Sequence, residues 1–179
     1  MPVRRAIAGE EDAMLEIVRE YNDGLVLYLN SFVNNISVAD ELAEDTFVRL
    51  GLKKPNHKGL SAFKTWLYAI GRNLALDYLR RAAREKRVFF CDCTDLPDEE
   101  LLEKRYLHEE RKVELHRALR RLKPEYRQVL WLIYFEGMTG KETSRIMKKT
   151  VHSVETLAYR ARRALKEELN REGFTCEDL

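Results

Sequence analysis

The chain has 179 residues, of which 45% are hydrophobic and 35% are charged, and its formal net charge is +2. That length fits one ordinary domain or two small ones, and the scarcity of Gly (8) and Pro (4) disfavours a sheet protein with many turns. No apolar run reaches the roughly 18 residues of a membrane helix, and an odd count of 3 cysteines argues against a disulfide-stapled secreted domain and favours the cytoplasm.

The first half of the chain has the apolar spacing of α-helices. We expect an amphipathic helix over about residues 11–21, a largely buried helix over 25–36, and a third helix with a capping-type start at Ser37. Residues 51–59 predict a loop, and a long helix begins at Ser61. A polar stripe of that long helix follows steps of four, three and four residues: Asn73, Asp77, Arg80 and Arg84.

The second half begins with an acidic stretch, because residues 92–110 contain eight acidic and two basic side chains. A new helix is expected at Pro124, since proline is favoured at the first helical position. Thr139 with Glu142 predicts a capping box for a short helix, and Thr150 can cap the final helix. We therefore predict an all-α protein with two small domains, residues 1–87 and 113–179, joined by an acidic linker over residues 88–112.

The last two predicted helices are typical of a helix-turn-helix, because they are joined by a tight turn and the second has a basic C-terminal part. In that motif the start of the second helix reaches base edges in the major groove, and cations contact phosphate. A helical hairpin with a solvated basic face is the alternative. The basic residues of this helix are Arg160, Arg162, Arg163 and Lys166.

The long helix of the first half combines aromatic and basic side chains, which suits single-stranded nucleic acid. Phe63, Trp66 and Leu67 have core spacing, so we expect them in the core. Tyr68, Arg72 and Asn73 are harder to explain as core residues. The acids of the preceding helix would, taken alone, only complement its dipole or form a solvated face.

Three motifs in this order carry a family resemblance: residues 39–47, residues 63–73 continuing to 77–81, and residues 119–162. Over nearly the whole chain they resemble a bacterial RNA polymerase sigma factor of the extracytoplasmic-function (ECF) group of the sigma-70 family. The resemblance implies that the acidic helix docks on the clamp helices of the polymerase largest subunit. The residues assigned to that contact are Asp40, Glu41, Glu44 and Asp45.

The resemblance also implies two contacts with promoter DNA. The loop at 57–61, with His57 and Lys58, would capture a flipped base of the −10 element, and Tyr68 and Asn73 would line that pocket. The backbone of the −10 element would be tracked by Arg72, Arg80, Arg81 and Arg84. The C-terminal domain would read the −35 element as duplex, with contacts from Glu155, Thr156, Tyr159, Arg160, Arg162 and Arg163.

The sequence departs from the family pattern at four of these positions. His57 stands where the family usually has Phe or Tyr, and imidazole stacks less well. Lys148 replaces the usual Gly of the turn, and Glu155 and Leu157 replace a basic residue and an Arg of the recognition helix. Glu155 repels phosphate and could instead accept a hydrogen bond from cytosine N4. The recognition helix is therefore the part of the chain that departs most from the family pattern.

We expect neither catalysis nor a metal or other cofactor. Cys91 and Cys93 lack the spacing and the second ligand pair of common zinc sites, so they predict free thiols in the linker, as does Cys176 near the end. No phosphate-cradling glycine loop or hydrolase motif is present in the sequence. No small-molecule substrate and no membrane insertion are expected.

The function predicted from the sequence is that of a transcription initiation factor whose partners are core RNA polymerase and promoter DNA. An anti-sigma factor is a further partner implied by the family alone. Two alternatives stay open: a stand-alone helix-turn-helix regulator, and a helical protein-interaction module whose basic faces are only solvated.

Overall fold

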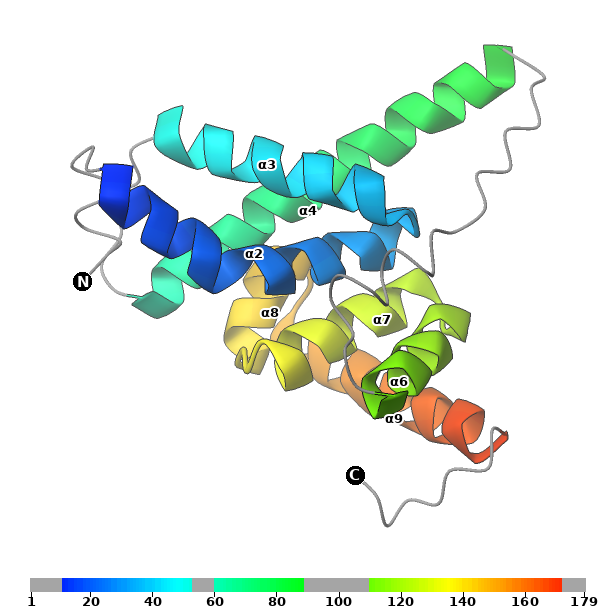
Figure 1. Cartoon of the computed structure of the whole chain (residues 1–179). Helices are drawn as coiled ribbons and strands as arrows, with labels where there is room; N and C mark the ends of the chain where they lie inside the picture. Colours follow the sequence, from blue (N-terminus) through cyan, green and yellow to red (C-terminus); the bar gives the residue numbers. More distant parts are fainter. Residues whose placement is uncertain (1–10, 53–59, 89–109, 172–179) are drawn as a thin grey trace. The chain divides into compact units, whose positions relative to one another are not determined.

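The computed structural model describes residues 11–52, 60–88 and 110–171, and within these residues it contains helices and no strand (Figure 1). This confirms the all-α prediction for the described residues. The chain divides into two compact units, Met1–Asp98 and Glu99–Leu179. The predicted linker over residues 88–112 lies almost wholly outside the described residues. None of the described helices is long and apolar enough to cross a membrane.

The N-terminal unit packs three helices against one another: α2 (Glu11–Val33), α3 (Ile36–Leu52) and α4 (Leu60–Val88) (Figure 1). Their apolar faces form one core, in which Phe63 and Leu67 are fully buried as expected. At Gly71 on α4 the helices approach so closely that a Cβ would lie 3.1 Å from Leu25 Cδ1 and 3.4 Å from Thr46 Oγ1. A larger residue at this crossing of α4 with α2 and α3 would therefore require its neighbours to shift by a few tenths of an ångström.

The two helices predicted over residues 11–21 and 25–36 form the single helix α2, so that prediction of a break is wrong. Tyr21, Leu25, Tyr28 and Phe32 continue one buried stripe through the predicted break. Burying such side chains is worth roughly 1.5–3 kcal/mol each, which exceeds the roughly 1 kcal/mol that a helical glycine such as Gly24 costs. Tertiary packing thus outweighs the cost of placing Gly24 inside a helix.

The N-terminal cap of α3 lies two residues before the predicted one. Asn35 Oδ1 accepts a hydrogen bond from the backbone N–H of Val38 at 3.1 Å, and the helix begins at Ile36. The cap is therefore Asn35 and not Ser37. Asn34, which precedes it, has φ 53°, a left-handed conformation that asparagine tolerates better than most residues.

In its described residues, 110–171, the C-terminal unit contains α6 (Glu110–Arg121), α7 (Pro124–Leu130), the π-helix η1 (Trp131–Phe135), α8 (Gly140–Met147) and α9 (Val151–Arg171) (Figure 1). Helix α9 packs against α6, α7 and α8. Pro124 stands in the first turn of α7 as predicted. Wider π-type winding in η1 brings the Trp131 and Phe135 rings into a stack with centroids 4.4 Å apart.

Both predicted caps of the helix-turn-helix are confirmed. Thr139 Oγ1 accepts from the backbone N–H of Glu142 at 3.3 Å, and Glu142 Oε2 accepts from the backbone N–H of Thr139 at 2.8 Å. Thr150 Oγ1 accepts from the backbone N–H of Ser153 at 3.1 Å. These bonds satisfy N–H groups that a helix start leaves without intrahelical partners.

Candidate nucleic-acid and protein interfaces

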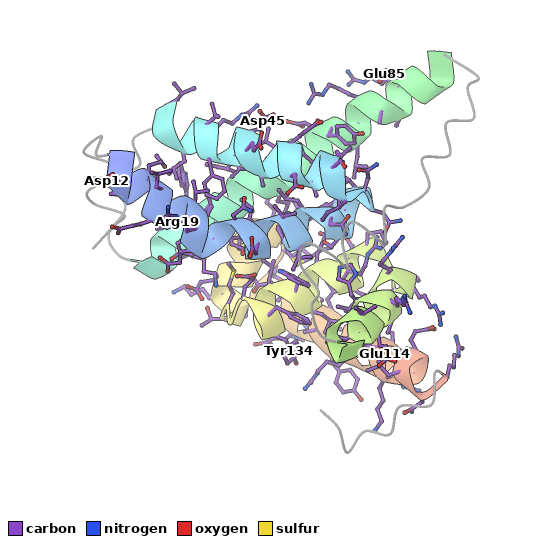
Figure 2. All side chains as sticks on the ribbon, in the orientation of Figure 1. Asp12, Arg19, Asp45, Glu85, Glu114 and Tyr134 are labelled. Carbon is purple, nitrogen blue, oxygen red and sulfur yellow. The ribbon has the colours of Figure 1, made fainter. Side chains whose placement is uncertain are left out.

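The predicted docking acids lie in the first half of α3. Glu41, Glu44 and Asp45 are exposed, and Asp40 is half-buried; Figure 2 shows Asp45 on this helix. Steps of three and four residues place Glu41, Glu44, Asp45 and then Val48 on neighbouring positions of one helix face. The structure therefore brings the acidic side chains together on a surface that a basic partner can reach.

The exposed face of α3 ends in apolar side chains that sequence reasoning missed. Val48 is 60% exposed and Leu52 is 79% exposed, and Leu15 on α2 is also exposed. Val48 and Leu52 follow Asp45 and Glu41 at helical spacing, and that spacing is the signal that could have found them. The acidic surface therefore merges into an apolar one toward the end of α3.

The polar stripe of α4 is exposed as its spacing predicts. Asn73, Arg81 and Arg84 are exposed, and the Arg80 guanidinium pairs with the Asp77 carboxylate at 3.0 Å, with both side chains largely in solvent. An exposed ion pair of this kind is weak, so it leaves Arg80 free to exchange partners. Three of the four predicted backbone-tracking cations, Arg80, Arg81 and Arg84, thus face solvent on α4.

Tyr68 and Arg72 are placed differently from the rest of the stripe. The Tyr68 ring is fully buried, with its centroid 5.2 Å from that of Tyr28, so a core role explains it, against our expectation. Arg72 is half-buried, and its Nε atom is enclosed without a hydrogen-bond partner. Burial raises the pKa of the Tyr28 hydroxyl, and the positive charge of Arg72 partly offsets that shift. Tyr28 therefore stays protonated beside Arg72.

Several predicted positions lie outside the described residues. They are His57, Lys58, Cys91, Cys93 and Cys176. Among the residues that are described, no three His, Cys, Asp or Glu side chains come together as a metal-binding group.

Helices α8 and α9 form the predicted helix-turn-helix, and the turn between them is left-handed. Lys148 has φ 55° and ψ 44°, and its backbone N–H donates to the carbonyl of Ser144. Lys149 Nζ pairs with Glu125 Oε1 on α7 at 3.1 Å. A lysine thus adopts the conformation for which the family pattern has glycine, and an ion pair beside it ties the turn to the rest of the unit.

The predicted −35 contacts of α9 lie mostly on its solvent side. Tyr159 is 62% exposed; Glu155, Arg160, Arg162 and Arg163 are exposed as well, and Thr156 is half-buried. The opposite side of α9 is buried through Val154, Ala158 and Ala161. One helix therefore holds the core with one side and presents an aromatic ring and several cations on the other.

A buried basic cluster was not recognised in the sequence. His116 on α6 is 8% exposed. Burial, with the charges of Arg120 and Arg127, lowers the pKa of His116 to about 4. Arg127 Nη1 donates to the carbonyl of Arg120 at 3.2 Å, and burial lowers the pKa of Arg127. Because His116 is neutral at pH 7, it is part of the structural core and not of a charged binding surface.

These features define a class: an all-α protein with a helical unit followed by a helix-turn-helix unit, a motif that many DNA-binding proteins use. Residues 17–85 match a family model described as sigma-70 region 2, and residues 112–165 match one described as sigma-70, region 4. The chain belongs to the sigma-70 family of RNA polymerase sigma factors, the proteins that direct transcription initiation.

Curated relatives agree with this assignment. The ECF RNA polymerase sigma factor BldN of Streptomyces coelicolor is 31% identical over 91% of this chain, which spans 62% of that relative's length. The RNA polymerase sigma-H factor of Pseudomonas aeruginosa is 28% identical, with 93% of this chain and 91% of the relative covered. The ECF sigma factor SigW of Bacillus subtilis is 25% identical, with 93% and 94% covered.

Solved structures share the fold. CnrH, in complex with the cytosolic domain of CnrY, matches with a TM-score of 0.64 and 24% identity over 95% of this chain and 96% of that one. The sigma factor RpoE of Bartonella quintana, in complex with the anti-sigma factor NepR, matches with a TM-score of 0.67 and 20% identity over 87% and 95%.

Proposed function

We propose that this protein binds core RNA polymerase and directs it to promoters that have a −10 and a −35 element, as an ECF-type sigma factor. The observation that carries the proposal is the presence of both sigma-70 regions, in order, each with an exposed charged face at the predicted residues. Bond formation in RNA synthesis would belong to the polymerase, so this chain is not an enzyme. Its place of action is the cytoplasm, where the polymerase works.

The acidic face of α3 is the polymerase contact in this proposal. Glu41, Glu44 and Asp45 are exposed within one turn of helix, where like charges repel one another. A basic partner surface relieves that repulsion and also accelerates association, because opposite potentials steer the encounter. Val48 and Leu52 extend the contact with apolar area.

The two DNA contacts divide between α4 and α9. Asn73 would approach the −10 strand, and Arg80, Arg81 and Arg84 supply exposed positive charge along α4. Tyr68 would support this surface indirectly, because its buried ring helps hold α4 in position. The start of α9 would enter the major groove of the −35 element, and Arg160, Arg162 and Arg163 would contact phosphate.

An anti-sigma factor is the further partner we propose. Two proteins of the same fold were solved in complex with another protein. In the RpoE complex that other protein is the anti-sigma factor NepR, and in the CnrH complex it is the cytosolic domain of CnrY. Affinity purification from the native host should recover such a protein together with this chain. Repeated recovery of polymerase subunits alone would contradict this part of the proposal.

The proposal is tested by co-migration of the full-length protein with core RNA polymerase on a sizing column. We expect a stoichiometric complex with the wild type, and its loss in the triple variant Asp40→Lys, Glu41→Lys, Glu44→Lys, because docking depends on negative charge. A matched control reverses three exposed acids of α2, Glu16, Glu20 and Asp23, and should keep the complex.

Two outcomes would contradict the proposal in different ways. No complex with the folded wild type would favour a stand-alone regulator or an interaction module. A complex that both triple variants retain equally would mean that polymerase binds elsewhere than on the acidic face of α3.

A further inference from the structure

One of the acids of α9 lacks the partner that the others have. Glu167 Oε1 accepts from Arg163 Nε at 3.3 Å. Glu168 Oε1 lies 2.7 Å from Arg171 Nη1, and Glu168 Oε2 lies 3.9 Å from Arg121 Nη1. Glu155 is exposed and forms no hydrogen bond or ion pair with any described residue. Its carboxylate is therefore available to a donor from outside the chain.

Glu155 also lies at the DNA-facing end of the helix. Helix α9 begins at Val151, and the first turns of the second helix of a helix-turn-helix are the part that reaches base edges. Glu155, Tyr159, Arg162 and Lys166 follow one another at steps of four, three and four residues, so they share one exposed side of α9. If Arg162 and Lys166, toward the C-terminal end of this side, bind phosphate, Glu155 would lie against the bases.

A carboxylate at this position is informative because few groups of DNA attract a negative charge. Phosphates repel it, so it weakens binding to every sequence unless a base donates a hydrogen bond to it. In the major groove cytosine offers the N4 amino donor, whereas the N6 donor of adenine stands beside the N7 acceptor, which repels the second carboxylate oxygen. Cytosine is therefore the base that a carboxylate accepts best.

We propose that Glu155 is a specificity-determining residue that reads cytosine in one G·C pair of the duplex bound by α9. This inference rests on the proposed function, because it requires α9 to lie in the major groove. A competing explanation is that an acid near a helix start only complements the helix dipole. That explanation allows a small change in stability on substitution but no change in base preference.

The test is a selection from a duplex library with randomised positions, using the full-length protein bound to core RNA polymerase. The wild type should enrich cytosine at one position by about tenfold over the other bases. Glu155→Ala should lose that preference while the rest of the motif stays. Glu155→Gln should move the preference toward adenine, because a carboxamide pairs with both N6 and N7. Glu167→Ala is the control and should leave the motif unchanged, since Glu167 already pairs with Arg163.

The outcomes separate the two levels of the argument. The same cytosine preference in the wild type and in Glu155→Ala would overturn the role of Glu155 and leave the proposed function standing. A wild-type motif that has no position restricted to cytosine would do the same. A folded wild type that selects no duplex sequence would overturn the proposed function together with this inference.

Discussion

At the scale of single residues, two positions of the C-terminal unit lower its stability: one by its backbone conformation and one, in acid, by the burial of its side chain. Lys148 adopts a left-handed backbone conformation that glycine adopts freely. His116 is buried near the charges of Arg120 and Arg127, so it cannot be protonated without loss. The condition at Lys148 is visible in the sequence only through the family pattern, which has glycine there. The burial of His116 is not visible, because a lone histidine gives no periodic signal. Both lead to measurable predictions.

Replacing Lys148 by glycine should stabilise the C-terminal unit. The left-handed conformation costs a residue with a Cβ roughly 1–2 kcal/mol, and glycine avoids this cost. About half of that advantage is offset by the greater conformational entropy that glycine loses on folding. We expect Lys148→Gly to raise the free energy of unfolding by about 1 kcal/mol in urea denaturation, relative to Lys148→Ala. Equal stabilities of the two variants would mean that the turn is not strained.

Stability should depend on pH through His116. Its pKa in the folded protein is about 4, below the ordinary histidine value of 6.5, so between these values the unfolded chain binds the proton more readily. Stability must therefore rise with pH across this window and be fully present above it. The loss approaches roughly 3 kcal/mol by pH 4, at 1.36 kcal/mol per pKa unit.

Urea denaturation from pH 4 to pH 7.5 measures this dependence. The variant His116→Gln keeps a polar side chain without the titration, so its stability should change less with pH over the same window. A wild type and a His116→Gln variant with parallel pH profiles would show that His116 is not the titrating group.

At the scale of helices, local signals predict the ends well and tertiary packing decides the rest. The Thr139–Glu142 box, Thr150 and Pro124 were all predictable, because each acts on backbone atoms within three residues. The continuity of α2 and the π-type winding of η1 were not, because both depend on how side chains pack against other helices. The crossing of α2, α3 and α4 at Gly71 belongs to this second kind.

Replacing Gly51 and Gly71 by alanine, one at a time, should distinguish the effect of helix preference on stability from the effect of close packing. Alanine favours helix over glycine by up to about 1 kcal/mol, and at Gly51 its Cβ would meet only Met14 Cε at 3.8 Å. At Gly71 the Cβ would lie 3.1 Å from Leu25 Cδ1 and 3.3 Å from Leu29 Cδ2, and both of these side chains are fully buried. We expect Gly51→Ala to gain about 0.5 kcal/mol and Gly71→Ala to lose about 1 kcal/mol in thermal or urea unfolding. Similar gains at both sites would contradict the close approach.

At the scale of the whole molecule, the net charge of +2 conceals a strong separation of charge. Acids gather on α3, and cations gather on the exposed sides of α4 and α9. Periodicity predicted this arrangement, because charged residues at helical steps must share a face. It could not predict that Tyr68 is enclosed, since aromatic residues occur both in cores and in stacking platforms. The exposure of Val48 and Leu52 could have been predicted from their helical spacing to Glu41 and Asp45, although their apolar type suggests burial.

The division of α9 into two sides has an evolutionary consequence. Val154, Ala158 and Ala161 keep the helix in its unit, whereas Glu155, Tyr159 and Arg162 take no part in the core. The positions that maintain the fold are therefore distinct from the positions that we propose to meet DNA, although they alternate along one helix. After a gene duplication, such a chain can drift toward a new set of target sequences through single substitutions that leave its folding intact.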